Sequence, residues 1–251
     1  MSGTSGCKAK MTVALLAGGR ATRLYPLTEG IPKSLAPVAG EPFLAHQLRW
    51  LGGQGVQDVV ICCGHLARPI REFACDGARF GVRVRYSEDG ERALGTGGAI
   101  RHALPLVGKR FLVMYGDSYL TAALGVLWAA FCGQELAGMM AVYRNENRWE
   151  ASNVEVGGGR VVRYAKGGGD EGLTHIDYGV SAFRADAFAG IPDGRTFDLG
   201  VVFQALIAGE GLGCHEVRER FYEIGSFEGL RETEAVLREM RCGSVPAKVR
   251  A

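Results

Sequence analysis

The sequence lacks the features that mark several large classes of protein. Its 251 residues include no apolar run near the roughly 18 residues that a membrane-spanning helix needs. Lysine and arginine number 29 against 27 acidic residues, which is not the basic excess of a protein that coats nucleic acid. Residues 1–10 are small and polar, so we expect a flexible tail and no signal peptide. We therefore predict a cytoplasmic protein without a membrane or nucleic-acid partner.

Metal-binding patterns of cysteine and histidine are also missing. None of the seven cysteines forms a C-x-x-C pair, and Cys62 and Cys63 are adjacent in an apolar run. The five histidines form no H-x-x-x-H or H-x-H cluster. The sequence thus gives no indication of a zinc site, and the cysteines are interpreted as core thiols of a reducing compartment.

The first half of the chain alternates apolar runs with helical stretches. Residues 11–17, 57–64 and 110–115 read as strands that are buried on both faces. A glycine-rich turn at 95–98 is expected to precede a helix at 99–106. This order predicts an α/β fold with a Rossmann-like, mostly parallel sheet flanked by helices.

The second half has a different pattern. Residues 153–156 and 160–164 flank three consecutive glycines, which predicts a β-hairpin. A helix is expected at 227–241, and no internal repeat or long linker is visible. We therefore expect one domain over residues 11–251, with a smaller antiparallel patch in its second half.

Two candidate site segments directly follow buried strands. Gly18 and Asp117 lie at such positions, and in parallel sheets ligands bind beyond the carboxyl ends of the strands. The pair Gly18-Gly19 would let backbone N–H groups approach an anion, and Arg20, Arg23 and Lys33 add positive charge nearby. The pattern predicts a phosphate-binding loop.

The loop fits neither of the common phosphate-binding motifs. Arg20 and Arg23 stand where a dinucleotide fingerprint requires glycine, and the G-K-[ST] of a Walker A loop is absent. From this pattern alone, a glycine turn with solvated arginines is an equally simple interpretation.

The stretch from Leu15 to Pro42 closely resembles the signature of the sugar-1-phosphate nucleotidylyltransferases, L-A-G-G-x-G-T-R-L-x-P-L-T-x-x-x-P-K-x-L-x-P-V-x-G-x-P. One departure is Ala21, where the signature has glycine; its methyl group could narrow the loop without removing its donors. The resemblance implies a GT-A-like sheet. It also implies a magnesium-dependent enzyme that joins a nucleoside triphosphate to a sugar 1-phosphate and releases pyrophosphate.

The resemblance assigns nucleotide binding to two segments. The first supplies Leu16, Ala17, Gly18, Gly19, Arg20, Thr22 and Arg23, and the second supplies Gly95, Thr96, Gly97 and Gly98. Glycines in the second segment would allow a flat base to lie on the backbone. Arg23, Lys33 and Asp117 are the implied catalytic residues, with Arg23 on the triphosphate and Lys33 on the reacting phosphates.

The resemblance further implies a magnesium ion held by two acids. Asp117 matches the metal-binding aspartate of the family, and Glu223 stands where the family's late W-x-D-x-G-T segment has its second aspartate. Mg²⁺ prefers one or two carboxylates plus phosphate oxygens, so both acids are predicted metal ligands. The longer side chain of Glu223 is the main departure at this site.

The sugar-phosphate site is implied by a third group of residues. Lys166 aligns with the lysine of the family's Glu-Lys pair, which contacts the sugar phosphate, whereas Ala165 replaces the glutamate that usually holds the sugar. The sugar contact then comes from elsewhere, or the sugar is unusual. Asn153, Tyr178 and Gly179 complete the predicted sugar-phosphate site.

The segments at 94–99 and 115–120 look most like those of enzymes that guanylylate heptose 1-phosphates. GTP and a heptose or related sugar are therefore expected, although muramic-acid-type uridylyltransferases share a similar glycine segment. A GT-A-type glycosyltransferase would commonly carry D-x-D, which is absent here. A non-catalytic nucleotide-sugar-binding relative is the other alternative, and a monomer and a homodimer both stay open.

Overall fold

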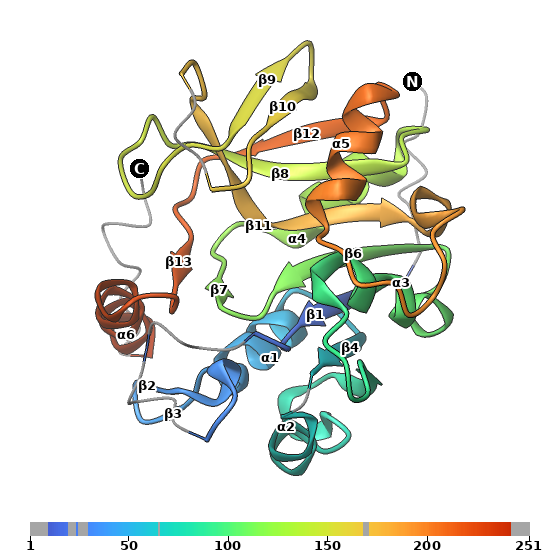
Figure 1. Cartoon of the computed structure of the whole chain (residues 1–251). Helices are drawn as coiled ribbons and strands as arrows, with labels where there is room; N and C mark the ends of the chain where they lie inside the picture. Colours follow the sequence, from blue (N-terminus) through green and yellow to red (C-terminus); the bar gives the residue numbers. More distant parts are fainter. Residues whose placement is uncertain (1–9, 20–23, 25–29, 65, 168–170, 242–251) are drawn as a thin grey trace, which may run out of the picture.

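The computed structural model describes residues 10–19, 24, 30–64, 66–167 and 171–241. Its centre is a nine-stranded sheet with helices on both faces (Figure 1). The expected α/β fold is confirmed, whereas the expected tail lies, apart from Lys10, outside the described residues. In the part of the chain that the structure describes, none of the helices has the length and apolar character needed to cross a membrane.

The first half of the sheet is parallel. It consists, in spatial order, of β5 (Arg83–Glu88), β4 (Asp58–Cys63), β1 (Thr12–Leu16) and β6 (Arg110–Tyr115). The central strand β1 is an aliphatic run that is covered on both faces, as is typical of a parallel sheet. The carboxyl ends of the four strands therefore meet at one edge of the sheet.

The second half of the sheet is mixed, which corrects the expectation of a mostly parallel sheet. β11 (His175–Arg184) runs antiparallel to β6 and to β8 (Gly138–Arg144), and β8 pairs in parallel with β12 (Leu212–Val217). Between β8 and β11 the described residues form a hairpin and no crossover helix, which is the kind of connection that leaves a strand antiparallel to its neighbours.

The predicted hairpin is confirmed as β9 (Val154–Gly157) and β10 (Arg160–Tyr164). β10 also pairs with β12, so the hairpin extends the main sheet at its edge. The antiparallel patch expected in the second half is thus continuous with the parallel half.

Among the described residues, five helices cover the sheet, namely α1 (Phe43–Gly53), α2 (Ala67–Ala74), α3 (Gly95–Val107), α4 (Leu124–Cys132) and α5 (Gly200–Ala208). α1, α2 and α4 share an apolar cluster with Val13 and Leu15, whereas α3 and α5 share a second cluster with Ala14. Neighbouring residues of β1 serve different clusters because successive side chains of a strand point to opposite faces.

A smaller unit lies beside the sheet, where α6 (Phe227–Arg241) stands next to β13 (Figure 1). It also contains β2 (Pro37–Val38) with β3 (Glu41–Pro42), and β7 (Ser118–Tyr119) with β13 (Tyr222–Glu223). Short 3-10 helices occur at Lys33–Leu35, Ala78–Phe80 and Ala185–Phe188. The pairing of β7 with β13 brings the residues after β6 next to the C-terminal region.

The segment at 95–98 corrects a second expectation, because it forms the first turn of α3 and not a separate turn. The amides of Gly97 and Gly98 both donate to the Phe197 carbonyl oxygen, at 3.1 and 3.2 Å. A carbonyl from a distant loop thus satisfies two donors that a helix start leaves unpaired. Three glycines in four residues suggested a turn, but this outside acceptor stabilises a helical start.

Candidate active site

Two cavities open at the carboxyl edge of the parallel strands and share Lys33, Thr96, Tyr115 and Asp117. The first cavity has a volume of about 260 Å³ and the second about 980 Å³. The first lies over the ends of β4, β1 and β6 and the start of α3, while the second extends toward β11 and α6. Ligands in the two cavities would meet at the four shared residues.

The first cavity contains most of the predicted nucleotide-binding residues. Leu16, Ala17, Gly18 and Gly19 line it from the end of β1, together with Gly95 and Thr96 from α3. The backbone is tightly packed beneath them: a Cβ on Gly116 would lie 2.4 Å from the Leu16 carbonyl oxygen. This close approach lets the segments after β1 and β6 form one continuous wall.

Gly97 and Gly98 do not line either cavity. They pack against the loop at 195–198, where a Cβ on Gly97 would lie 2.3 Å from a ring carbon of Phe197 and one on Gly98 would lie 2.4 Å from the Arg195 carbonyl oxygen. Their small size therefore serves the packing that fixes the start of α3, which in turn places Gly95 and Thr96 at the cavity.

Lys33 and Asp117 form the centre of the shared wall. Lys33 Nζ donates to Asp117 Oδ2 at 2.7 Å, across 84 positions of sequence. The Lys33 side chain is only 16% exposed, whereas that of Asp117 is 41% exposed. The ammonium group is therefore held in place by a carboxylate that still faces the cavity.

Glu223 lies next to this pair. Glu223 pairs with Ser118 where β13 lies against β7, and the amide of the next residue, Ile224, donates to the Asp117 carbonyl oxygen at 2.9 Å. Its carboxylate accepts hydrogen bonds from the Gly225 amide and from Ser226 Oγ. The structure thus places both predicted metal ligands at one wall, with the carboxylate of Glu223 turned toward its own loop.

Lys166 reaches the site through an acid that the sequence did not single out. Its Nζ and Thr96 Oγ1 both donate to Asp198 Oδ2, the latter at 2.9 Å, and the Gly200 amide donates to Asp198 Oδ1 at 2.9 Å. Burial acts to raise the pKa of Asp198, but these hydrogen bonds outweigh it and lower the pKa below its ordinary value. One carboxylate therefore links a residue of the first cavity to a residue of the second.

The other predicted sugar-side residues line the second cavity with Asp177. Asn153 Oδ1 accepts a hydrogen bond from the Asp177 amide at 2.9 Å. The Tyr178 hydroxyl instead accepts from the amides of Thr121 and Ala122, at 3.1 Å each, so it holds the loop after β7. Gly179 has φ +94°, which lets the chain turn beneath the cavity.

Asp177 is a half-buried carboxylate that accepts hydrogen bonds from the Gly179 amide at 3.0 Å and from the Tyr115 hydroxyl at 3.3 Å. Burial raises the pKa of Asp177 to about 6, against the opposing effect of these two hydrogen bonds. From the sequence, only its neighbours Tyr178 and Gly179 were predicted to belong to the sugar-phosphate site. The structure shows that Asp177 also lines the second cavity.

The raised pKa of Asp177 predicts a pH-dependent effect on stability. The folded state retains the proton to about pH 6, whereas the unfolded chain loses it near 3.8. Asp177 therefore reduces the free energy of unfolding as pH rises through this window, by at most about 3 kcal/mol. Asp177→Asn does not titrate, so urea unfolding should show the variant gaining stability relative to the wild type between about pH 4.5 and about pH 7.5. If the difference in unfolding free energy between Asp177→Asn and the wild type were the same at both pH values, the raised pKa of Asp177 would be contradicted.

A buried arginine also lines the second cavity. Arg220 is 8% exposed, its guanidinium lies 3.4 Å from the ring centroid of Trp149 and 5.0 Å from that of Tyr222, and it pairs with Glu232. Stacking and pairing of this kind hold an arginine firmly. Arg220 was not identified from the sequence, because an arginine near a strand end is a common surface feature.

Three predicted site residues, Arg20, Thr22 and Arg23, lie outside the described residues. Asp89 and Asp198, which line the first and the second cavity, were also not identified from the sequence. Asp198 could have been noticed in the sequence, because an aspartate just before a helix is a common capping residue. In the structure its side chain accepts a hydrogen bond from the Gly200 amide, where the helix begins. Asp89 follows β5 in the same way that Gly18 follows β1. This similar position after a strand could have identified Asp89 as a candidate site residue.

Comparison with known proteins gives a consistent result. The family model described as nucleotidyl transferase matches residues 12–152. The N-acetylmuramate alpha-1-phosphate uridylyltransferase of Neisseria meningitidis serogroup B is 30% identical over 231 residues, which cover 90% of this chain and 98% of that protein. The D-glycero-alpha-D-manno-heptose 1-phosphate guanylyltransferase of Campylobacter jejuni is 34% identical over 117 residues, or 47% of this chain and 52% of that protein.

Among solved structures, HddC from Yersinia pseudotuberculosis has the same fold. It superposes with a TM-score of 0.76 at 20% sequence identity, and the match covers 90% of this chain and 99% of that one. The shared fold therefore extends beyond residue 152 and includes the mixed half of the sheet.

Proposed function

Since the chain belongs to the nucleotidyl transferase family of sugar-1-phosphate nucleotidylyltransferases, we propose that it transfers a guanylyl group from GTP to the 1-phosphate of a heptose or a related sugar. The products would be a GDP-sugar and pyrophosphate, in a step of nucleotide-sugar biosynthesis. The observation that carries the proposal is the meeting of two cavities at Lys33 and Asp117.

The two cavities differ as the two substrates do. The smaller one has aliphatic walls that include Leu16, Ala17 and Ala99, which suit the flat face of a nucleoside. The larger one is lined by polar side chains that include Asn153, Lys166 and Asp177, which suit a sugar with several hydroxyl groups. The support for guanine and heptose comes from the 94–99 and 115–120 segments and from the Campylobacter jejuni relative.

The reaction is an in-line displacement at phosphorus. An oxygen of the sugar 1-phosphate attacks the α-phosphorus of the triphosphate, and the bond from that phosphorus to the β-phosphate oxygen breaks. The attacking phosphate is already ionised near neutral pH, so no group of the protein has to remove a proton. The protein mainly aligns the reactants and neutralises charge.

The residues of the chain divide this work between the two cavities. Lys33 Nζ, fixed by Asp117, would face the reacting phosphates where the cavities join. Lys166 and Asp198 both line the second cavity. Lys166 Nζ would therefore leave the Asp198 carboxylate and bind a sugar phosphate in that cavity. Arg23 remains the proposed contact of the triphosphate.

The two acids near Lys33 fit a divalent metal. Asp117 lines both cavities and accepts a hydrogen bond from Lys33 Nζ. Glu223 lines the second cavity, and a Cβ on Gly225 would lie 3.2 Å from Lys33 Nζ and still closer to a carboxylate oxygen of Glu223. Among the described residues no set of three or more acids, histidines or cysteines could hold a metal, but Mg²⁺ bound with a nucleotide needs only one or two carboxylates. We propose that Asp117 and Glu223 hold Mg²⁺, which when bound neutralises phosphate charge in the transition state.

A second candidate function is the same reaction with UTP and N-acetylmuramate 1-phosphate. It is favoured by the Neisseria meningitidis relative, whose match covers nearly the whole of both chains. The two candidates use the same site and differ in the base and the sugar.

A substrate matrix tests the proposal. Pyrophosphate release would be measured with Mg²⁺ for GTP, UTP, CTP, dTTP and ATP, each combined with heptose, mannose, glucose, N-acetylglucosamine and N-acetylmuramate 1-phosphates. We expect turnover with GTP and a heptose 1-phosphate above every other pair. Turnover restricted to UTP and N-acetylmuramate 1-phosphate would support the second candidate, and no release from any pair would contradict both.

A further inference from the structure

The Asp198 carboxylate has three hydrogen-bond donors, and only one of them is on a flexible side chain. Asp198 Oδ2 accepts from Lys166 Nζ and from Thr96 Oγ1, and Oδ1 accepts from the Gly200 amide. Lys166 and Asp198 line the second cavity, whereas Thr96 lines both cavities. In the part of the chain that the structure describes, Asp198 is the only acid that pairs with Lys166. The lysine thus rests on a carboxylate of the protein inside the cavity where a sugar phosphate would bind.

The carboxylate of Asp198 is held in place without the lysine. The Gly200 amide is fixed because it begins α5. The Thr96 hydroxyl accepts a hydrogen bond from the Leu199 amide at 2.8 Å, so its single proton is left to donate to Asp198. Both of these donors remain if Lys166 departs. Asp198 would therefore keep its position when the lysine binds another partner.

Lys166 is the more exposed member of the pair. Its side chain is 68% exposed, against 35% for that of Asp198. An ammonium group on a four-carbon chain has three donors and can reorient readily. Lys166 can therefore change its partner while the carboxylate stays where it is.

The charges of the two possible partners decide which of them holds the lysine. Burial opposes ionisation of Asp198, but the hydrogen bonds from Lys166, Gly200 and Thr96 lower the pKa of Asp198 below its ordinary value, so it carries one negative charge. A phosphate monoester carries about −1.5 to −2 at neutral pH and attracts an ammonium group more strongly. In the sugar nucleotide the same phosphate is part of a diphosphate and carries a single charge, so this advantage over the carboxylate is lost.

We propose that Asp198 competes with the sugar phosphate for Lys166, so that the lysine binds the dianionic substrate and returns to Asp198 once the product has formed. Asp198 is then a positioning residue, because it acts through Lys166. The competition weakens the binding of the substrate and speeds the release of the sugar nucleotide. This inference rests on the proposed function in placing a sugar phosphate at Lys166.

Asp198→Asn separates the competition from the packing of the site. Asparagine caps a helix as well as aspartate does and can still accept from the Gly200 amide, so the start of α5 is retained. It has no charge to hold the lysine. We expect calorimetry to show that the variant binds heptose 1-phosphate and orthophosphate about 3- to 10-fold more tightly than the wild type, as for the loss of a competing ion pair. A merely structural role would not produce a gain in affinity.

The product gives a second readout. GDP-heptose should gain more affinity than heptose 1-phosphate in Asp198→Asn, because in the wild type its phosphate does not draw the lysine away from the carboxylate. Product inhibition in the variant should therefore strengthen by a larger factor than the KM for the sugar phosphate falls.

Lys166→Gln and the double variant test whether the effect acts through the lysine. In the Lys166→Gln background, Asp198→Asn should change the affinity for heptose 1-phosphate and orthophosphate by less than about 2-fold, because the group for which Asp198 competes is gone. Asp193→Asn is the matched control. Asp193 lies in the loop that leads to Asp198, is 53% exposed, pairs with His102 and lines neither cavity.

Two results would overturn the inference. One is unchanged or weaker binding of both phosphates by Asp198→Asn, and the other is a gain of the same size with and without Lys166. Orthophosphate makes the test independent of the sugar: a Lys166-dependent gain for orthophosphate, with no binding of heptose 1-phosphate, would support the role of Asp198 and contradict heptose as the substrate. Failure of the proposed function appears separately, as absence of pyrophosphate release from every pair in the substrate matrix.

Discussion

Asp117→Asn is expected to lower kcat by about 10²- to 10³-fold, equivalent to about 3–4 kcal/mol of transition-state stabilisation. Asp117 is the only acid that lines both cavities in the described part of the chain, and it also fixes Lys33. An asparagine keeps the shape but not the charge. The substitution would therefore weaken both the binding of the metal and the ion pair with the Lys33 ammonium group.

The metal dependence separates these two effects. The Mg²⁺ concentration that gives half-maximal activity should rise in Asp117→Asn, and direct titration with Mn²⁺ should show weaker binding to the variant. Asp186→Asn is the control, because Asp186 is 54% exposed, pairs with Arg184 and lines neither cavity. An unchanged metal requirement and an unchanged kcat in Asp117→Asn would rule out its proposed role.

Lys33→Gln is expected to reduce kcat to a similar extent, about 10²- to 10³-fold, with little change in the Mg²⁺ requirement. Lys33 is largely buried and its ammonium group lies where the two cavities join, so we propose that its charge acts on the reacting phosphates. Glutamine can still donate a hydrogen bond but cannot neutralise charge. A loss in kcat with a nearly constant KM for the sugar phosphate would indicate a transition-state interaction.

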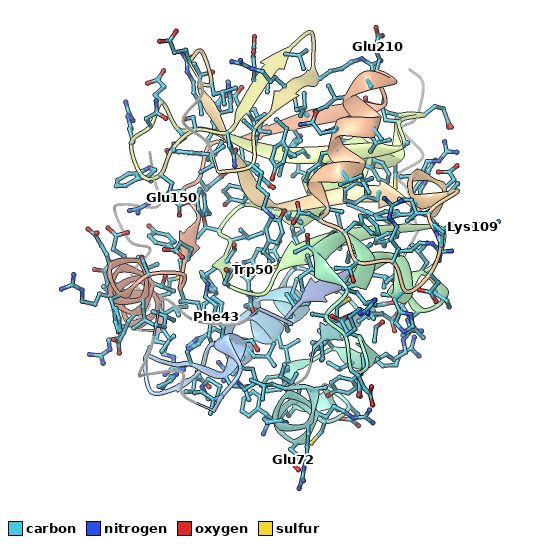
Figure 2. All side chains as sticks on the ribbon, in the orientation of Figure 1. Phe43, Trp50, Glu72, Lys109, Glu150 and Glu210 are labelled. Carbon is cyan, nitrogen blue, oxygen red and sulfur yellow. The ribbon has the colours of Figure 1, made fainter. Side chains whose placement is uncertain are left out.

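Lys109→Gln is the matched control for this experiment. Lys109 is exposed and lies on the opposite side of the molecule from Glu150, which lines the second cavity (Figure 2). A Lys33→Gln variant as active as Lys109→Gln would mean that the cavities do not meet at the reaction centre. A variant with raised KM and normal kcat would limit Lys33 to substrate binding.

The meeting of Lys33 and Asp117 was predictable because both residues lie in local patterns. Lys33 belongs to a signature that follows one buried strand, and Asp117 directly follows another. Since both strands are parallel neighbours of the same sheet, their ends had to lie close together. The ion pair across 84 positions is therefore a consequence of two short-range patterns.

The mixed half of the sheet and the acids at 89 and 198 were not predictable in the same way. The direction of β11 depends on how the chain returns after β8, which apolar periodicity does not reveal. An aspartate after a strand or before a helix is a common turn or capping residue. Only the packing of the 195–198 loop against α3 shows that Asp198 joins Thr96 to Lys166.

The most direct test of nucleotidyl transfer follows the α-phosphate of the triphosphate. GTP labelled at the α-phosphorus would be incubated with the chain, Mg²⁺ and a heptose 1-phosphate, and the products separated by chromatography. We expect the label to appear in a sugar nucleotide, with one pyrophosphate released for each molecule formed. Label that stays in GTP, or that appears in GDP or GMP without a sugar nucleotide, would contradict this expectation.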